Sequence, residues 1–328
     1  MIKKLKHIST LIVLSSTLVF SGCTIKQQDN LFDRAINMAR DSAGLEVKVA
    51  PAGDVNLTYM ERASSVENSA GNSETIILVH GFSSNKDTWI RFTDALDEKY
   101  RVIAVDLAGH GDSDRSMVTN YDLIEQADRL EAFFNGLKID SFHIVGSSMG
   151  GAISLLYSLT HPSKIQSLTL MNSAGIDGDT QSEYFKILAK GKNPLIANDE
   201  ESFEFRMDLT MSQPPFLPWP LKPAFLRKTL AREAINSKIF NDMVSTKERL
   251  QEEDFDTKIK TIMAKNKLPT LIMWGKEDRV LDVSAAAAFK QLIPHAQLHI
   301  FEDVGHLPML EVPQESAEVF QDFMSSAQ

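Results

Sequence analysis

One serine in this 328-residue chain stands in a pattern that suits a nucleophile. The run VGSSMGG at residues 145–151 contains G-x-S-x-G, with Ser148 at its centre. An apolar segment, 142–145, precedes it and a segment with helical spacing, 152–156, follows it, so the pattern predicts a strand, a tight turn and a helix. Such a turn exposes the serine hydroxyl above the sheet, and the glycines let neighbouring backbone approach closely. A Gly-rich turn that merely closes a βα unit is the alternative.

A serine hydroxyl becomes a nucleophile when a base removes its proton and an acid orients that base. We assign the acid to Asp278, just past the apolar run 270–274, and the base to His306, just past the last apolar run, 297–301. Because ligand sites in open α/β sheets lie at the carboxyl ends of the strands, these side chains are expected to converge with Ser148. Other side chains nearby could take the same roles: Glu277 or Asp282 as the acid, and His80 or His110 as the base.

Acyl transfer at such a serine also needs hydrogen-bond donors for the developing oxyanion. The backbone N–H of Met149, directly after the nucleophile, is one expected donor. The other is expected in the loop HGFSS (80–84), which follows the apolar run 75–79. The N–H of Phe82 is the candidate there, with Gly81 leaving room for the backbone to turn. Both assignments rest on position alone, because a backbone donor has no side-chain signature.

Short apolar runs recur along the chain with helical segments between them. Nearly continuous apolar runs are typical of parallel strands buried on both faces, and they stand at 75–79, 102–105, 142–145, 168–171, 270–274 and 297–301. Alternating runs, typical of half-exposed antiparallel strands, stand at 45–49 and 55–59. Helices are expected at about 86–98, 120–136 and 149–160, with another beginning near Pro313. This alternation predicts an α/β fold with a mostly parallel, doubly wound sheet.

The rhythm of strands and helices breaks between residues 175 and 265. We predict that this segment is a helical cap inserted between two strands, with the α/β core at 45–174 and 266–328. Its large apolar side chains could line a pocket for an acyl or aromatic group, or could simply pack the cap onto the core. Both uses stay open for Phe203, Phe205, Met207, Met211, Phe216, Trp219 and Phe225.

The amino terminus carries a targeting pattern. Three lysines within the first six residues precede an apolar stretch from Ile8 to Phe20, which is typical of a secretory signal and short for a transmembrane helix. The single cysteine, Cys23, follows directly and resembles the acylated cysteine of a bacterial lipobox, although Phe20 stands where that motif usually has Leu. A buried thiol, or a signal peptide cut elsewhere, is the alternative. We therefore predict a lipoprotein signal peptide at 1–22, a lipid-modified Cys23 and a tether at 23–44 that contains a short helix.

These features predict export across the inner membrane. Thr24 after the cysteine favours a lipid anchor in the bacterial outer membrane, by resemblance to lipoprotein sorting rules. The formal net charge of −10 and the lack of a basic tract in the sequence argue against nucleic acid as a partner. The sequence contains no Cys/His cluster and no phosphate-binding glycine loop.

Several motifs together resemble the α/β-hydrolase superfamily, from about residue 74 to the end of the chain. They are HGF at 80–82, DLAGHGDS at 106–113, GSSMGG at 146–151, WGKED at 274–278 and GH at 305–306. The chain order Ser, Asp, His is the order that this superfamily uses. Within it, the run HGFSSNKDTW (80–89) is similar to a stretch in the bacterial lipase/esterase group that includes Moraxella and Psychrobacter lipases.

The resemblance implies a serine carboxylic ester hydrolase, lipase-like, that cleaves triacylglycerol or other acyl esters. Ser148, Asp278 and His306 would act through an acyl-enzyme. The reaction would need neither a metal nor a cofactor, which agrees with the lack of a Cys/His cluster and of a phosphate-binding glycine loop in the sequence. Epoxide hydrolases and haloalkane dehalogenases have an aspartate at the position of the nucleophile, so a serine at 148 argues against both activities. Carbon–carbon bond hydrolases and cofactor-free perhydrolases use the same three residue types and are alternatives, and a non-catalytic surface lipoprotein is a third.

Overall fold

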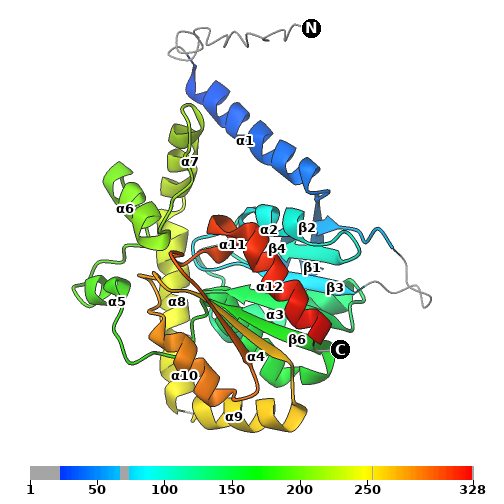
Figure 1. Cartoon of the computed structure of the whole chain (residues 1–328). Helices are drawn as coiled ribbons and strands as arrows, with labels where there is room; N and C mark the ends of the chain where they lie inside the picture. Colours follow the sequence, from blue (N-terminus) through cyan, green and yellow to red (C-terminus); the bar gives the residue numbers. More distant parts are fainter. Residues whose placement is uncertain (1–22, 67–73, 253, 327–328) are drawn as a thin grey trace, which may run out of the picture.

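The computed structural model describes residues 23–66, 74–252 and 254–326 (Figure 1). Within these ranges, eight strands form one sheet in the order β1-β2-β4-β3-β5-β6-β7-β8. β1 pairs with β2, and β2 with β4, in antiparallel fashion, whereas every later pair is parallel. The strands are β1 (Glu46–Ala52), β2 (Val55–Arg62), β3 (Thr75–Val79), β4 (Arg101–Val105), β5 (Phe142–Ser147), β6 (Ile165–Met171), β7 (Thr270–Gly275) and β8 (Gln297–Phe301).

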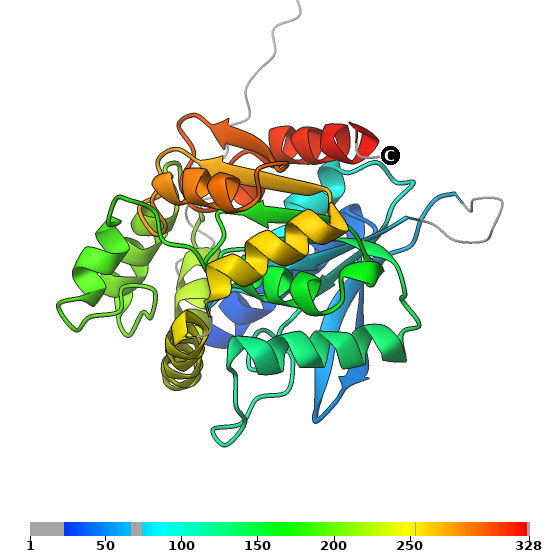
Figure 2. The same ribbon diagram turned by 90° about the horizontal axis from the view of Figure 1, so that it is seen from below.

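Helices cover both faces of this sheet, and Figure 2 shows α12 and α3 on opposite sides of it. One face is covered by α2 (Ile90–Ala95), α11 (Pro308–Glu311) and α12 (Pro313–Ser326). The other is covered by α3 (Leu123–Gly136), α4 (Met149–Thr160), α9 (Phe255–Asn266) and α10 (Ser284–Leu292). A short 3-10 turn, η3 (Pro162–Lys164), joins α4 to β6.

The central strands are apolar because both of their faces are buried. In β3, Ile77 and Val79 pack with α3 and α4, while Ile76 and Leu78 pack with α2 and α12. Each residue of β3, β5 and β7 is buried, as expected for parallel strands between two helical layers. The predicted mostly parallel, doubly wound sheet is therefore confirmed.

An insertion of helices lies between β6 and β7, which confirms the predicted helical cap. Its members are α5 (Glu183–Leu188), α6 (Glu200–Thr210), α7 (Leu221–Leu230) and α8 (Glu233–Glu252), and α9 then leads back to the sheet. Ahead of the sheet, α1 (Ile25–Ser42) begins with a capping box in which the Thr24 side chain accepts from Gln27 N–H and the Gln27 side chain accepts from Thr24 N–H.

The helical segment expected at about 86–98 is present but shorter than predicted. It begins as a 3-10 turn, η2 (Lys86–Trp89), and continues as the short α2, which ends at Ala95. Two side chains explain the tight first turn: the Asn85 side chain accepts from Asp87 N–H at 2.9 Å, and Asp106 accepts from Lys86 N–H at 2.6 Å. These local bonds hold the backbone in place of a regular helical start.

Candidate active site

Ser148 lies on the sharp turn that joins β5 to α4. Its backbone has φ 55° and ψ −122°, a region that a residue with a side chain adopts only when its surroundings force it. Two glycines permit the turn, because a Cβ on Gly146 would lie 2.3 Å from the carbonyl oxygen of Gly150, and a Cβ on Gly150 would lie 2.3 Å from that of Val79. The residues around Ser148 thus form the strained strand–turn–helix geometry that their sequence pattern predicts.

Asp278 and His306 come from the loops after β7 and β8, and their side chains meet. His306 Nδ1 lies 2.7 Å from Asp278 Oδ2, and the two residues are only 4% and 5% exposed. The backbone N–H groups of Val280 and Leu281 donate to the other oxygen, Oδ1, at 2.7 and 2.9 Å. Because Nδ1 faces a carboxylate, it is the nitrogen that carries the proton, and Nε2 is left as the proton acceptor.

Asn172 is a member of this constellation that the sequence reasoning missed. It follows β6 directly, with φ 45°, and its amide nitrogen donates to Asp278 Oδ2 at 2.7 Å. The same side chain accepts from Gly275 N–H at 3.3 Å. Asn172 therefore ties the acid to the ends of β6 and β7. Its only signal was a polar residue at the carboxyl end of an apolar run, the place where the predicted site residues also stand.

The cap holds the backbone of the His306 loop. Thr210, at the end of α6, accepts from His306 N–H at 2.9 Å. The Glu311 carboxylate accepts from Gly305 N–H at 3.1 Å and from Ser212 N–H at 2.8 Å. One acidic side chain on α11 thereby joins the loop that carries the histidine to the loop that leaves α6. Nothing in the sequence pattern distinguishes Glu311 from an ordinary solvated acid.

The two backbone amides expected to bind an oxyanion lie beside the serine. Phe82 and Met149 line the same cavity as Ser148. Among the described residues, neither amide N–H donates to a protein acceptor, whereas Ser148 N–H donates to Met171 O at 3.1 Å. A Cβ on Gly81 would lie 3.0 Å from the Ser148 Cβ, so glycine lets the Phe82 loop approach the nucleophile. The arrangement supplies two unpaired donors at the place where negative charge would develop.

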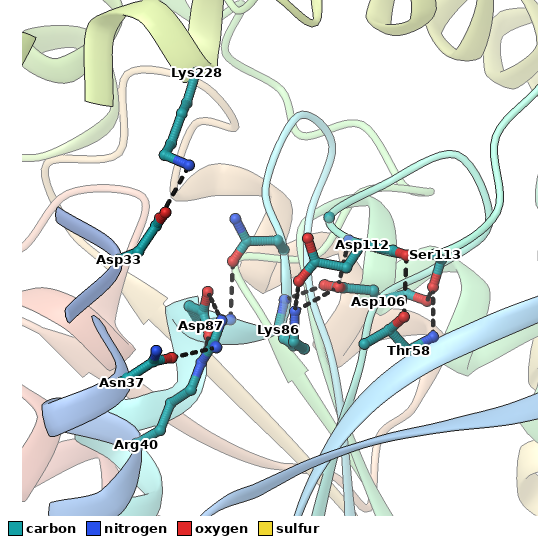
Figure 3. A network of polar contacts seen from close by, with 12 residues as sticks. Asp33, Asn37, Arg40, Thr58, Lys86, Asp87, Asp106, Asp112, Ser113 and Lys228 are labelled. Atoms are coloured by element: carbon teal, nitrogen blue, oxygen red, sulfur yellow. Dashed lines mark hydrogen bonds and ion pairs between the residues drawn. The ribbon is translucent and has the colours of Figure 1, made fainter. Parts of the chain in front are cut away.

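A buried ionic network lies under the loop that carries Phe82 (Figure 3). Lys86 Nζ contacts Asp106 Oδ2 at 2.8 Å and Asp112 Oδ2 at 2.6 Å, and both Lys86 and Asp106 are fully buried. Burial alone would lower the pKa of Lys86, but the neighbouring carboxylates raise it above its ordinary value. Asp112 stands at the exposed end of the network; the partial desolvation of its carboxyl would raise its pKa, and the hydrogen bond from Lys86 lowers it. These charges lock the loop in place, so the HGFSSNKDTW run serves structure as well as chemistry.

The rival histidines have structural partners. His80 is fully buried, accepts from Leu107 N–H at 3.1 Å and contacts Gly81 O at 2.7 Å. Burial lowers the pKa of His80 and, still further, that of His110, which packs edge-to-face on it. In residues 23–66, 74–252 and 254–326, no group of three or more His, Cys, Asp and Glu side chains is arranged to hold a metal ion.

A cavity of about 530 Å³ adjoins Ser148. Its size falls in the range of pockets that enclose small-molecule ligands. Apolar side chains dominate the lining, with those of the core and of cap helices α5 and α8 facing each other: Phe82, Leu123, Met149, Leu155, Tyr184, Phe185, Leu188, Phe240 and Met243. The cavity therefore has the character of a site for an apolar chain next to the serine.

The seven apolar cap residues considered as pocket lining lie elsewhere, and none of them borders this cavity. Phe203 and Phe225 pack edge-to-face with ring centres 5.3 Å apart, and Phe225 stacks on Phe32 of α1 at 5.9 Å. Phe216 and Trp219 are 88% and 43% exposed. The pocket interpretation of these residues was wrong, because α7 packs on α6 and on α1, while side chains of α5 and α8 line the cavity at Ser148.

The predicted lipid-attachment residue, Cys23, is partly buried just ahead of α1. The predicted signal peptide, residues 1–22, lies outside the described residues. Across the part of the chain that is described, no helix is both long and apolar enough to span a membrane. α1 packs on α7 and is tied to η2 through Arg40, whose guanidinium donates to both oxygens of Asp87 at 2.8 and 2.7 Å.

Comparisons with known proteins agree with this geometry. The model of the α/β hydrolase fold family matches residues 74–313. Lipase 3 of Moraxella sp. (strain TA144) is 32% identical over 323 residues, which cover 97% of this chain and 98% of that lipase. Lipase 1 of Psychrobacter immobilis is 31% identical, with 90% and 89% covered. The resemblance to this group of bacterial lipases is confirmed.

Among solved structures, the crystal structure of a membrane phospholipase A, described as a bacterial virulence factor, is similar over 92% of both chains. The TM-score is 0.83 and the sequence identity 33%. The family match spans the strands from β3 to β8 and the residues around Ser148. The chain belongs to the α/β-hydrolase fold family.

Proposed function

We propose that the chain is a serine carboxylic ester hydrolase, lipase-like in its substrates. Ser148 is the nucleophile, His306 its base and Asp278 the acid that orients the base. The observation that carries the proposal is the 2.7 Å contact between His306 and Asp278, at the same sheet edge as the strained turn of Ser148 and its apolar cavity. The relatives named as lipases support an acyl ester as the substrate.

In the first step, Ser148 Oγ attacks the ester carbonyl carbon while His306 Nε2 takes the hydroxyl proton. Asp278 stabilises the imidazolium that forms, and the N–H groups of Phe82 and Met149 bind the oxyanion. Collapse of this intermediate returns the proton to the departing alcohol and leaves the acyl group on Ser148. Water then attacks the acyl-enzyme with His306 again as base, which releases the fatty acid and restores the serine hydroxyl.

The first prediction concerns the nucleophile. Ser148→Ala should lower turnover of p-nitrophenyl acyl esters by roughly 10⁴- to 10⁶-fold, because the oxyanion donors and the cavity alone give little catalysis. The neighbouring Ser147→Ala is the matched control, since the buried Ser147 hydroxyl has no hydrogen-bond partner among the described residues. A fluorophosphonate probe should label the native chain and the Ser147 variant but not the Ser148 variant.

Activity that survives in Ser148→Ala would remove this residue from the mechanism. A panel of substrates separates the three candidate activities. Esters with short to long acyl chains test the ester hydrolase, a vinylogous ring-fission diketone tests the carbon–carbon hydrolase, and a peracid assay tests the perhydrolase. Fluorophosphonate labelling without turnover of any of these substrates would contradict the ester hydrolase. The apolar cavity leads us to expect esters with an extended acyl chain to be preferred over acetate.

We also propose that the chain is exported and anchored by a lipid on Cys23, in the bacterial outer membrane. The basic start, the apolar stretch from Ile8 to Phe20 and the single cysteine after it support this location. Metabolic labelling with a fatty-acid analogue should mark the full chain and leave Cys23→Ser unlabelled. Equal labelling of both chains, or of neither, would contradict acylation at this residue.

A further inference from the structure

The loop that joins α6 to α7 places aromatic side chains in solvent. Residues 212–220 read SQPPFLPWP, and the chain has no charged residue from Leu209 to Leu221, although its net charge is −10. Phe216 is 88% exposed and Trp219 is 43% exposed. The four prolines restrict the backbone before any partner binds, so little conformational entropy is lost when this loop is covered.

The loop lies at the same end of the molecule as the start of α1. α7 follows the loop directly and packs on α1, with Arg227 of α7 hydrogen-bonded to Gln28 Oε1 at 2.9 Å and Phe225 stacked on Phe32. In Figure 1 the beginnings of α1 and α7 lie together, away from the sheet. Ile25, in the first turn of α1, is also exposed.

Cys23, the proposed site of the lipid, stands two residues before α1 begins. A lipid on Cys23 would therefore join the molecule at the end where the aromatic loop is exposed. Lys26, in the first turn of α1, places a positive charge at the same end, where lipid phosphates would lie, whereas Lys222 at the start of α7 is paired with Glu204 at 2.6 Å.

We infer that Phe216, Trp219 and Ile25 form a docking surface that enters the head-group region of a lipid bilayer. Tryptophan is enriched at that boundary because its ring is apolar and its N–H is polar. A second copy of the chain fits this surface less well: two aromatic side chains so exposed offer roughly 300 Å² together, whereas a stable dimer buries about 800 Å² on each partner. The inference does not depend on the reaction at Ser148.

Tryptophan fluorescence tests the inference directly. The chain has three tryptophans, and Trp89 and Trp274 are fully buried, so a change on membrane contact reports Trp219. Full-length Ser148→Ala, which would not consume the lipid, is reconstituted in vesicles of phosphatidylethanolamine and phosphatidylglycerol. The emission should shift to the blue relative to detergent-free chain in buffer, and phospholipids brominated on the acyl chains should quench it. Trp219→Phe should abolish both effects.

Phe216→Ser should lower the ratio of docked to undocked loop by roughly tenfold, because the phenyl ring no longer enters the bilayer. The loss should be seen as weaker quenching of Trp219 by the brominated lipids. Val118→Ser is the matched control, since Val118 is 93% exposed on the loop between β4 and α3. The inference fails if the chain sediments with vesicles while Trp219 stays open to iodide in water. It also fails if the blue shift appears without lipid and grows with protein concentration, since a second copy would then cover the surface.

Discussion

Asn172 shows how one side chain can set the behaviour of a site without touching substrate. Its amide donates to the Asp278 oxygen that also faces His306, and its φ of 45° suits Asn, Asp or Gly. Asn172→Asp keeps the shape and brings a second carboxylate against Asp278. The added negative charge favours the imidazolium, so we expect the acid limb of the kcat/KM profile to move up by about one pH unit.

Asn172→Gly is the companion variant, because it keeps the backbone conformation and removes only the amide. We expect it to lower kcat by about tenfold and to leave the acid limb in place, since no charge is added. Profiles of p-nitrophenyl ester hydrolysis from pH 4 to 9 measure both. Superimposable profiles for the native chain and Asn172→Asp would show that Asn172 does not position the acid.

At the residue level, the sequence predicts those site residues whose neighbours along the chain form a recognisable pattern. Ser148 sits between glycines whose spacing the tight turn requires, and His306 follows the last strand. The cap aromatics had no such signature, because an apolar side chain is equally suited to a pocket and to packing. Phe225 stacks on Phe32 of α1, some 190 residues earlier in the chain, and Phe203 packs on Phe225; no pattern within the cap shows the contact with α1.

Among the elements, the cap and the His306 loop are coupled through Glu311. Its carboxylate accepts from Gly305 N–H and from Ser212 N–H, and the Thr210 carbonyl accepts from His306 N–H. Glu311→Ala leaves the N–H groups of Gly305 and Ser212 without this acceptor, so the loop that carries the proposed base is held less firmly. We expect kcat to fall by about tenfold or more, or about 1.4 kcal/mol, with KM little changed.

Hydrogen exchange provides the structural readout for Glu311. Amides of residues 211–221 and 304–307 should exchange faster in Glu311→Ala, and Glu311→Gln should restore part of both the protection and the rate, because its carbonyl oxygen still accepts. The exposed Glu315→Ala, one turn away on α12, is the control. Unchanged exchange in the 304–307 loop would contradict the coupling.

The strands were predictable because burial on both faces leaves long apolar runs, and β3, with every residue buried, stands where it was expected. The 3-10 start of the helical segment predicted at 86–98 was not predictable, since its first turn is held by Asp106, which follows the next strand. The local structure there depends on a hydrogen bond between residues 20 positions apart in the chain, and the helical spacing of apolar residues cannot predict that bond.

For the whole molecule, buried histidines set the acid limit of stability. Burial lowers the pKa of His80, His110 and His143, to about 4 for His143. In the unfolded chain these rings take up protons near pH 6.5. Below that pH the unfolded state binds more protons than the folded state, so the free energy of unfolding falls as the pH drops toward 4. His143 alone contributes roughly 3 kcal/mol to this fall.

Urea unfolding at several pH values between 7.5 and 4.5 measures this dependence. His143→Gln keeps a polar side chain facing Ser167 and removes the proton-binding ring, so its stability should decline less steeply with acid. Parallel curves for the native chain and the variant would show that His143 does not contribute.

The way α1 is fastened bears on how this enzyme can be handled. Phe32 covers Phe225 of the cap, and Arg40 holds Asp87, the neighbour of the buried Lys86 that anchors the loop of Phe82. A shortened recombinant version is therefore best cut just ahead of Thr24. Removal of everything before Leu45 would strip an aromatic cover from the cap and an ion pair from the segment beside the Phe82 loop, and so discard part of the folded body.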